Sequence, residues 1–176
     1  MKTTQRFFGA IILVITMMVA GTAGGNTIDA IGGNAIVDRH LVDLRQGFYL
    51  LDTNQPFRGK GRLTHWEIFS ETTNPVQLVV YRQVGGVFFV VGVSAVEIPT
   101  VGYNLFTLKE RIAVDRGDFI GMFHPSTGSV SFTIDSPGTD DFGDLTGTVL
   151  FTDQGGGATN FTGSSNRRYS IRAFKE

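Results

Sequence analysis

The sequence predicts an all-β protein, an antiparallel β-sandwich of about eight strands. Three observations support this fold class. Several short segments alternate apolar and polar residues with the period of a strand. Glycine accounts for 23 of the 176 residues, and turn signals containing it separate these segments. Hydrophobic residues make up 41% of the chain and charged residues 18%, a composition that can bury a core and is not typical of disorder.

The first element is a predicted signal peptide, residues 1–23. Lys2 and Arg6 give a positive start, 7–20 is almost entirely apolar, and small residues up to Ala23 offer a cleavage site. The alternative is an uncleaved anchor, but a membrane-spanning helix needs about 20 apolar residues. The sequence therefore predicts a secreted protein with no stable membrane insertion after cleavage.

A glycine-rich N-terminal arm, 24–47, is expected to precede a sandwich domain, 48–176. Its first part, 24–36, fits either a mobile arm or a first edge strand. Its second part, 37–46, is expected to form one or two helical turns. The three apolar residues that share a face at helical spacing there are Val37, Leu41 and Leu44.

The strand pattern is clearest from residue 61 onward. Residues 61–69 alternate, and two β-rich runs, 76–84 and 87–93, flank Gly85 and Gly86, which predicts a hairpin with a primed turn covered on both faces. Further strands are expected at 48–51, 104–114, 119–124, 129–135, 148–152 and 169–174, with a long loop at 153–168 and the last strand pairing near the first.

Residues 66–132 resemble the jelly-roll modules of secreted and cell-surface proteins, such as the C1q-like and galactose-binding-like modules. The resemblance is carried by an apolar strand, 112–114, that leads through Gly117-Asp118 into a second apolar strand beginning Phe119-Ile120. It implies that the sandwich is a jelly roll.

Several classes of function are disfavoured. Fifteen basic residues against 16 acidic ones give none of the positive excess typical of nucleic-acid binding. The absence of cysteine excludes thiol catalysis and cysteine-ligated zinc, and neither a Gly-x-Ser-x-Gly elbow nor a phosphate-binding loop occurs. His40, His65 and His124 lack the His-x-His spacing of a cupin-type metal site and are interpreted as unrelated side chains. A non-enzymatic protein is therefore predicted.

Calcium is the one cofactor that the sequence suggests. Asp135, Asp140, Asp141 and Asp144 lie in or beside one glycine-containing loop, and Ca²⁺ takes six to eight oxygen ligands. Their spacing is not that of an EF-hand. The competing interpretation is an acidic loop in solvent.

The predicted function is a secreted module that binds a carbohydrate or an extracellular protein through loops at one end of the sandwich. Tyr103 is the aromatic ring expected in solvent, whereas Trp66 is expected in the core. Asn104 and Asn166 are, with Tyr103, the candidate contacts with a ligand. Asn160 begins an Asn-Phe-Thr sequon, which is a glycosylation site if the protein comes from a eukaryote.

The alternative function is a structural subunit of an extracellular coat or matrix. In that interpretation the arm at 24–36 and the sheet edges pair with neighbouring copies, which gives a homo-oligomer.

Overall fold

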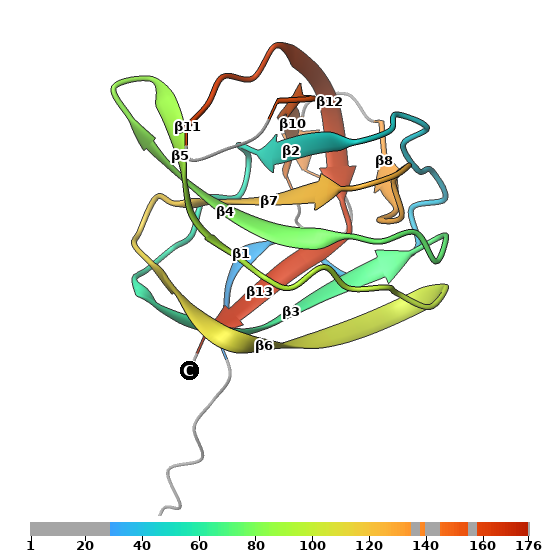
Figure 1. Ribbon diagram of the computed structural model, residues 1–176, viewed down its shortest axis with the longest axis horizontal. Helices are drawn as coiled ribbons and strands as arrows, with labels where there is room; N and C mark the ends of the chain where they lie inside the picture. Colours follow the sequence, from blue (N-terminus) through green and yellow to red (C-terminus); the bar gives the residue numbers. More distant parts are fainter. Residues whose placement is uncertain (1–28, 135–137, 140–144, 155–157, 176) are drawn as a thin grey trace, which may run out of the picture.

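The computed structural model describes residues 29–134, 138–139, 145–154 and 158–175. Within these residues every regular element is a β-strand, and the strands form two antiparallel sheets that lie in two layers (Figure 1). The prediction of an all-β, sandwich-like protein is confirmed. The predicted signal peptide, 1–23, and the four aspartates of the predicted calcium loop lie outside the described residues.

The smaller sheet contains four strands in the order β1-β13-β3-β6. They are β1 (Asp29–Gly33), β13 (Ile171–Lys175), β3 (Gly61–Ser70) and β6 (Gly102–Val114). β1 pairs with β13 so that Asp29 lies opposite Lys175, which confirms that the last strand pairs near the first. Of the two interpretations of 24–36, the described part is an edge strand.

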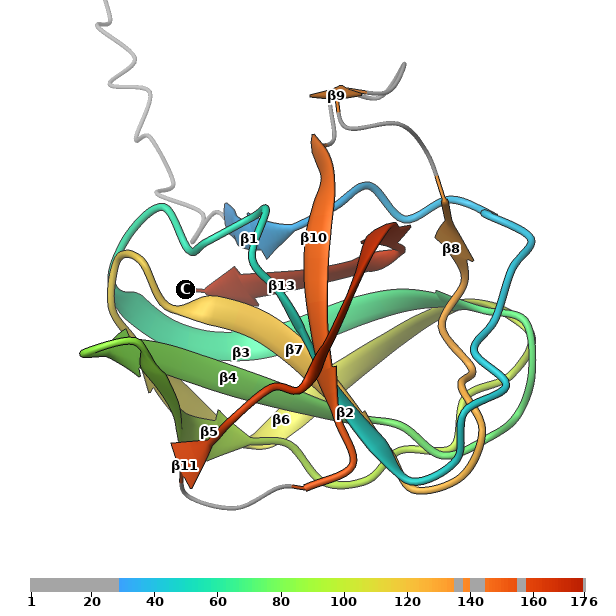
Figure 2. The same ribbon diagram turned by 90° about the horizontal axis from the view of Figure 1, so that it is seen from above.

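The larger sheet follows the order β11-β5-β4-β7-β2-β10-β12-β8, and β9 pairs with β10 at its end (Figure 2). Three of its described strands have only two residues; these short strands, together with β1 and β12, bring the strand number above the predicted eight. The bounds are β2 (Phe48–Asp52), β4 (Gln77–Val84), β5 (Val87–Val93), β7 (Phe119–His124), β8 (Phe132–Thr133), β9 (Gly138–Thr139), β10 (Leu145–Thr152), β11 (Ala158–Thr159) and β12 (Gly163–Tyr169).

The main core lies between the two sheets. It combines inward residues of the smaller sheet, such as Trp66 and Ile68, with residues of the larger one, such as Leu50 and Val80. Trp66 is fully buried, as expected, with its ring centroid 4.7 Å from that of Phe106. Burying these side chains supplies most of the driving force for folding.

A second cluster covers the other face of the larger sheet. Val79 and Tyr81 of β4 are buried there with Phe88 of β5, and Phe161, from the segment between β11 and β12, packs on them. The ring centroids of Phe161 and Tyr81 are 5.5 Å apart. β4 is therefore covered on both faces, as predicted for the hairpin, whereas β5 lies near the sheet edge.

The hairpin turn between β4 and β5 is confirmed. Gly85 and Gly86 have φ angles of 57° and 83°. Two successive positive φ angles define a type I′ turn, which matches the twist of the flanking strands and which glycine adopts without strain.

The helical turns predicted at 37–46 are wrong, because tertiary contacts hold this segment in an irregular path. The Arg39 guanidinium Nε donates to Ser170 Oγ at 2.9 Å, and Tyr169 OH donates to Asp43 Oδ2 at 2.6 Å. Arg167 also donates to the Asp43 carboxylate. These contacts with the C-terminal strands outweigh a weak local preference for helix.

Two predictions near the C-terminal half are also wrong in extent. Only Phe132 and Thr133 of the alternating segment 129–135 form a strand in the described residues, although Val130 makes an isolated bridge with Ser70. Conversely, the predicted loop 153–168 contains β11 and most of β12. β12 pairs with β10 despite its polar Gly-Ser-Ser-Asn sequence, because backbone pairing needs no apolar side chain.

Candidate functional site

The candidate site is the outer face of the smaller sheet. Alternation along β6 places Tyr103 and Leu105 on the side away from the core, where they are 55% and 53% exposed. The register sets Leu105 opposite Glu67, and Glu67 opposite Arg172. We call this surface the outer platform; its residues are His65, Glu67, Tyr103, Leu105, Arg172 and Phe174.

A polar network fixes the outer platform. Tyr103 OH donates to Glu67 Oε1 at 2.6 Å, and Arg172 Nη2 donates to Glu67 Oε2 at 2.8 Å. Burial of the hydroxyl, together with its hydrogen bond to Glu67, raises the pKa of Tyr103 to about 12. The phenol therefore stays protonated at neutral pH, and the hydrogen bond holds the ring in place while the residue remains 55% exposed.

A small recess of about 130 Å³ lies within the platform. Glu67 and Leu105 line it together with His65 and Phe174. Typical enclosed ligand pockets measure about 300–1,000 Å³. The platform therefore offers a shallow contact surface with a fixed carboxylate, and it does not enclose a small molecule.

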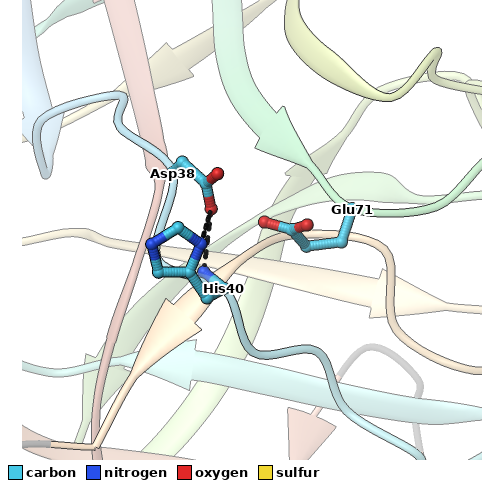
Figure 3. Close-up of side chains that lie close together, drawn as sticks. All are labelled: Asp38, His40 and Glu71. Atoms are coloured by element: carbon cyan, nitrogen blue, oxygen red, sulfur yellow. Dashed lines mark hydrogen bonds and ion pairs between the residues drawn. The ribbon is translucent and has the colours of Figure 1, made fainter.

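A second group of polar side chains lies outside the platform. Asp38 and His40 precede β2, Glu71 follows β3, and Figure 3 shows the Glu71 carboxylate directed toward the other two. One potential ligand atom from each residue lies within 4.8 Å of the others. Burial, followed by the nearby Asp38 carboxylate, raises the pKa of Glu71.

The predicted binding residues do not converge on one loop cluster. Tyr103 belongs to the platform, but the neighbouring Asn104 amide is used internally, since it bonds Thr100 N, Thr100 O and Gly102 O at 2.8–2.9 Å. Asn166 is exposed on β12, in the other sheet, opposite Thr148 of β10. Asp135, Asp140, Asp141 and Asp144 lie outside the described residues.

The glycosylation sequon lies between β11 and β12. Asn160 is exposed, and the residue after it, Phe161, is anchored in the second core cluster. Thr162 N donates to Phe151 O at 3.0 Å. The sequon thus presents its asparagine from a segment that is held on both sides.

Sequence reasoning missed most of the platform. The alternation in 61–69 puts the side chains of Glu67 and Trp66 on different faces of their strand. The alternation in 169–174 does the same for Arg172 and Ile171. That signal separates the two faces of each strand. It does not show that β3, β6 and β13 are neighbours, because strand order is not encoded in local periodicity.

In comparisons with known proteins, no family model, curated protein or solved structure matches this chain. In the part of the chain that the structure describes, no helix has the length and apolar character needed to cross a membrane.

Proposed function

We propose that this protein is a secreted, non-enzymatic binding module that recognises a carbohydrate through the outer platform. The observation that carries the proposal is that Tyr103 is an exposed aromatic residue whose hydroxyl is hydrogen-bonded to Glu67. Arg172 in turn holds the Glu67 carboxylate. Such a ring can cover the apolar face of a sugar, and the adjacent polar groups can bond its hydroxyls.

The chain path supports a jelly roll as the finer description of the fold. β1, β3, β6 and β13 lie in the smaller sheet, whereas β2, β4, β5 and β7 lie in the larger one. From β1 to β7 the chain crosses between the layers at every connection except the β4–β5 hairpin, and β8 to β12 stay in the larger sheet before the chain crosses to β13. Eight strands wound between two sheets in this way are the basis of jelly rolls, which include lectin domains.

The chemistry of the platform supports binding over catalysis. The neutral Tyr103 hydroxyl already donates to Glu67, so it is not an activated nucleophile. The Glu67 carboxylate is engaged by both Tyr103 and Arg172. A shallow, pre-organised surface loses little entropy on binding a rigid ligand.

A glycan array probed with the purified chain tests the proposal, once with calcium and once with EDTA. We expect binding to a defined sugar class, and we expect Tyr103→Ala to weaken it by about tenfold, or about 1.4 kcal/mol. Phe89→Ala is the matched control, because Phe89 is an exposed ring on β5 of the other sheet.

The outcomes separate the interpretations. Binding that EDTA abolishes and that added Ca²⁺ restores would favour the predicted calcium loop, 135–144. Binding that survives in Tyr103→Ala would remove the platform from the proposal. No binding to any glycan would contradict the carbohydrate function.

The structural subunit remains a second candidate, supported by the edge strand β6. Among the described residues β6 pairs only with β3, and the segment leading into it exposes Ile98 and Val101 at 74% and 65%. Exposed apolar edges favour association. Because β1 pairs with β13 and its Ile31 O also accepts a hydrogen bond from Arg58 N at 2.9 Å, assembly would use the β6 edge. Val101→Lys should then abolish a concentration-dependent increase in mass measured by light scattering.

A further inference from the structure

We propose that Asp38, His40 and Glu71 form a surface site for a divalent transition-metal ion of the Zn²⁺ type. This inference is independent of the carbohydrate function, because the three residues belong to neither the outer platform nor the predicted calcium loop. The donor set consists of two carboxylates and one imidazole, drawn from two segments that are distant in sequence.

Glu71 is positioned by its backbone. Glu71 N donates to Ser129 O at 2.8 Å, and the preceding Ser70 Oγ donates to Thr72 O at 2.7 Å. One carboxylate oxygen, Glu71 Oε1, is shielded from solvent and has no hydrogen-bond partner among the described residues. An unsatisfied, shielded acceptor is costly, and a cation bonded to it would remove that cost.

His40 and Asp38 form the other side of the group. Asp38 Oδ1 accepts from His40 N at 2.9 Å and lies 2.8 Å from His40 Nδ1. The backbone at His40 has a φ of 65°, a conformation that is uncommon for residues other than glycine. Figure 3 shows His40 beside both Asp38 and Glu71.

The ligand spacing can adjust around an ion, although the 2.8 Å between Asp38 Oδ1 and His40 Nδ1 would have to widen. Zn²⁺ bonds of about 2.0–2.1 Å set tetrahedral ligands about 3.3–3.5 Å apart. The atoms here lie within 4.8 Å, and the side chains of His40 and Asp38 are 80% and 43% exposed, which leaves both free to adjust their rotamers. Water would complete the coordination sphere.

The ligand types select the metal class. An imidazole nitrogen suits Zn²⁺ and its transition-metal neighbours, whereas Ca²⁺ and Mg²⁺ prefer sites made entirely of oxygen. Two carboxylates and a neutral imidazole also carry the charge that balances a divalent cation. The competing interpretation is an ion pair between protonated His40 and Asp38 that requires no metal.

The test is calorimetric titration of the untagged, EDTA-stripped full chain with Zn²⁺, followed by Co²⁺ absorption in the visible range. We expect one equivalent to bind, with a ligand-field band that indicates nitrogen and oxygen ligands. Both His40→Ala and Glu71→Gln should weaken binding by at least about tenfold. His65→Ala is the control, since it removes an imidazole from the outer platform.

Thermal melts of each variant in EDTA check that the fold persists. Two results would overturn the site: no saturable Zn²⁺ binding by the unsubstituted chain, or binding that both His40→Ala and Glu71→Gln leave unchanged. A clear preference for Ca²⁺ over Zn²⁺ would contradict the assignment of metal class.

Discussion

At the scale of single residues, His124 is a fully buried imidazole. Its ring stacks on Phe48 with centroids 4.9 Å apart, and neither ring nitrogen has a hydrogen-bond partner among the described residues. Desolvation lowers the pKa of His124 to about 3. The folded protein therefore holds this histidine neutral, at a cost in stability when the surrounding solution becomes acidic.

The pH dependence of stability follows from that shift. The unfolded chain protonates His124 near pH 6.5, whereas the folded chain does so near pH 3, so the unfolded state binds more protons between these values. The free energy of unfolding should fall as pH drops below about 6.5. From pH 7 to pH 5 we expect a loss of about 2 kcal/mol from this residue, measured by urea denaturation at each pH.

His124→Leu provides the comparison. An apolar side chain carries no titrating group, so the variant should lack this loss and be at least as stable as the parent at pH 7. A parent and variant with parallel pH profiles between 7 and 5 would show that His124 does not cause the dependence.

Asp118 illustrates what residue types alone can and cannot predict. The sequence places Gly117-Asp118 between two apolar strands, and the chain does turn there, with a φ of 92° at Gly117. The Asp118 carboxylate also accepts from Asp115 N and from Arg82 at 2.8 Å, which raises the pKa of Arg82. The ion pair depends on the register of β4 against β7, which lies outside the motif.

At the scale of elements, glycines inside strands mark close approaches. Gly121 lies in β7, where a Cβ would come 2.3 Å from Leu50 O and 2.6 Å from the Tyr81 ring. Gly163 in β12 has more room, since its nearest neighbour would be Phe151 Cβ at 3.8 Å. A methyl group therefore has room at Gly163 and none at Gly121.

These two glycines give a matched pair of substitutions. Gly121→Ala should lower the free energy of unfolding by about 1–3 kcal/mol, because a backbone oxygen cannot move aside cheaply. Gly163→Ala should change it by less than about 0.5 kcal/mol. Chemical denaturation of both variants measures the difference, and equal effects would mean that β7 shifts to accept the methyl group.

The strands that were predicted well share a strong local signal. The alternation of 61–69 and the Gly-Gly turn of the β4–β5 hairpin specify structure within a few residues. The polar strand β12 and the irregular segment 37–46 carry no such signal. Distant partners decide both, through pairing with β10 in the first case and through Asp43 and Arg39 in the second.

At the scale of the whole molecule, the fold class was predictable and the arrangement of strands was not. Period and turns predict all-β structure, but the order β1-β13-β3-β6 joins segments from both ends of the chain. The candidate sites depend on this order. Tyr103 was predictable as an exposed ring, whereas its contact with Glu67, and the approach of Glu71 to His40, arise only after folding.

The pairing of β1 with β13 brings the first and last described strands side by side. Because Asp29 faces Lys175, a short linker could join the two strands without crossing the molecule, and new ends could be opened between Gly85 and Gly86, where an added Cβ would meet nothing. Such a circular permutant should fold with an unchanged far-ultraviolet spectrum. If the permutant fails to fold, the covalent β4–β5 turn is required for folding. If it folds, the strands can reach this arrangement whichever segment is synthesised first.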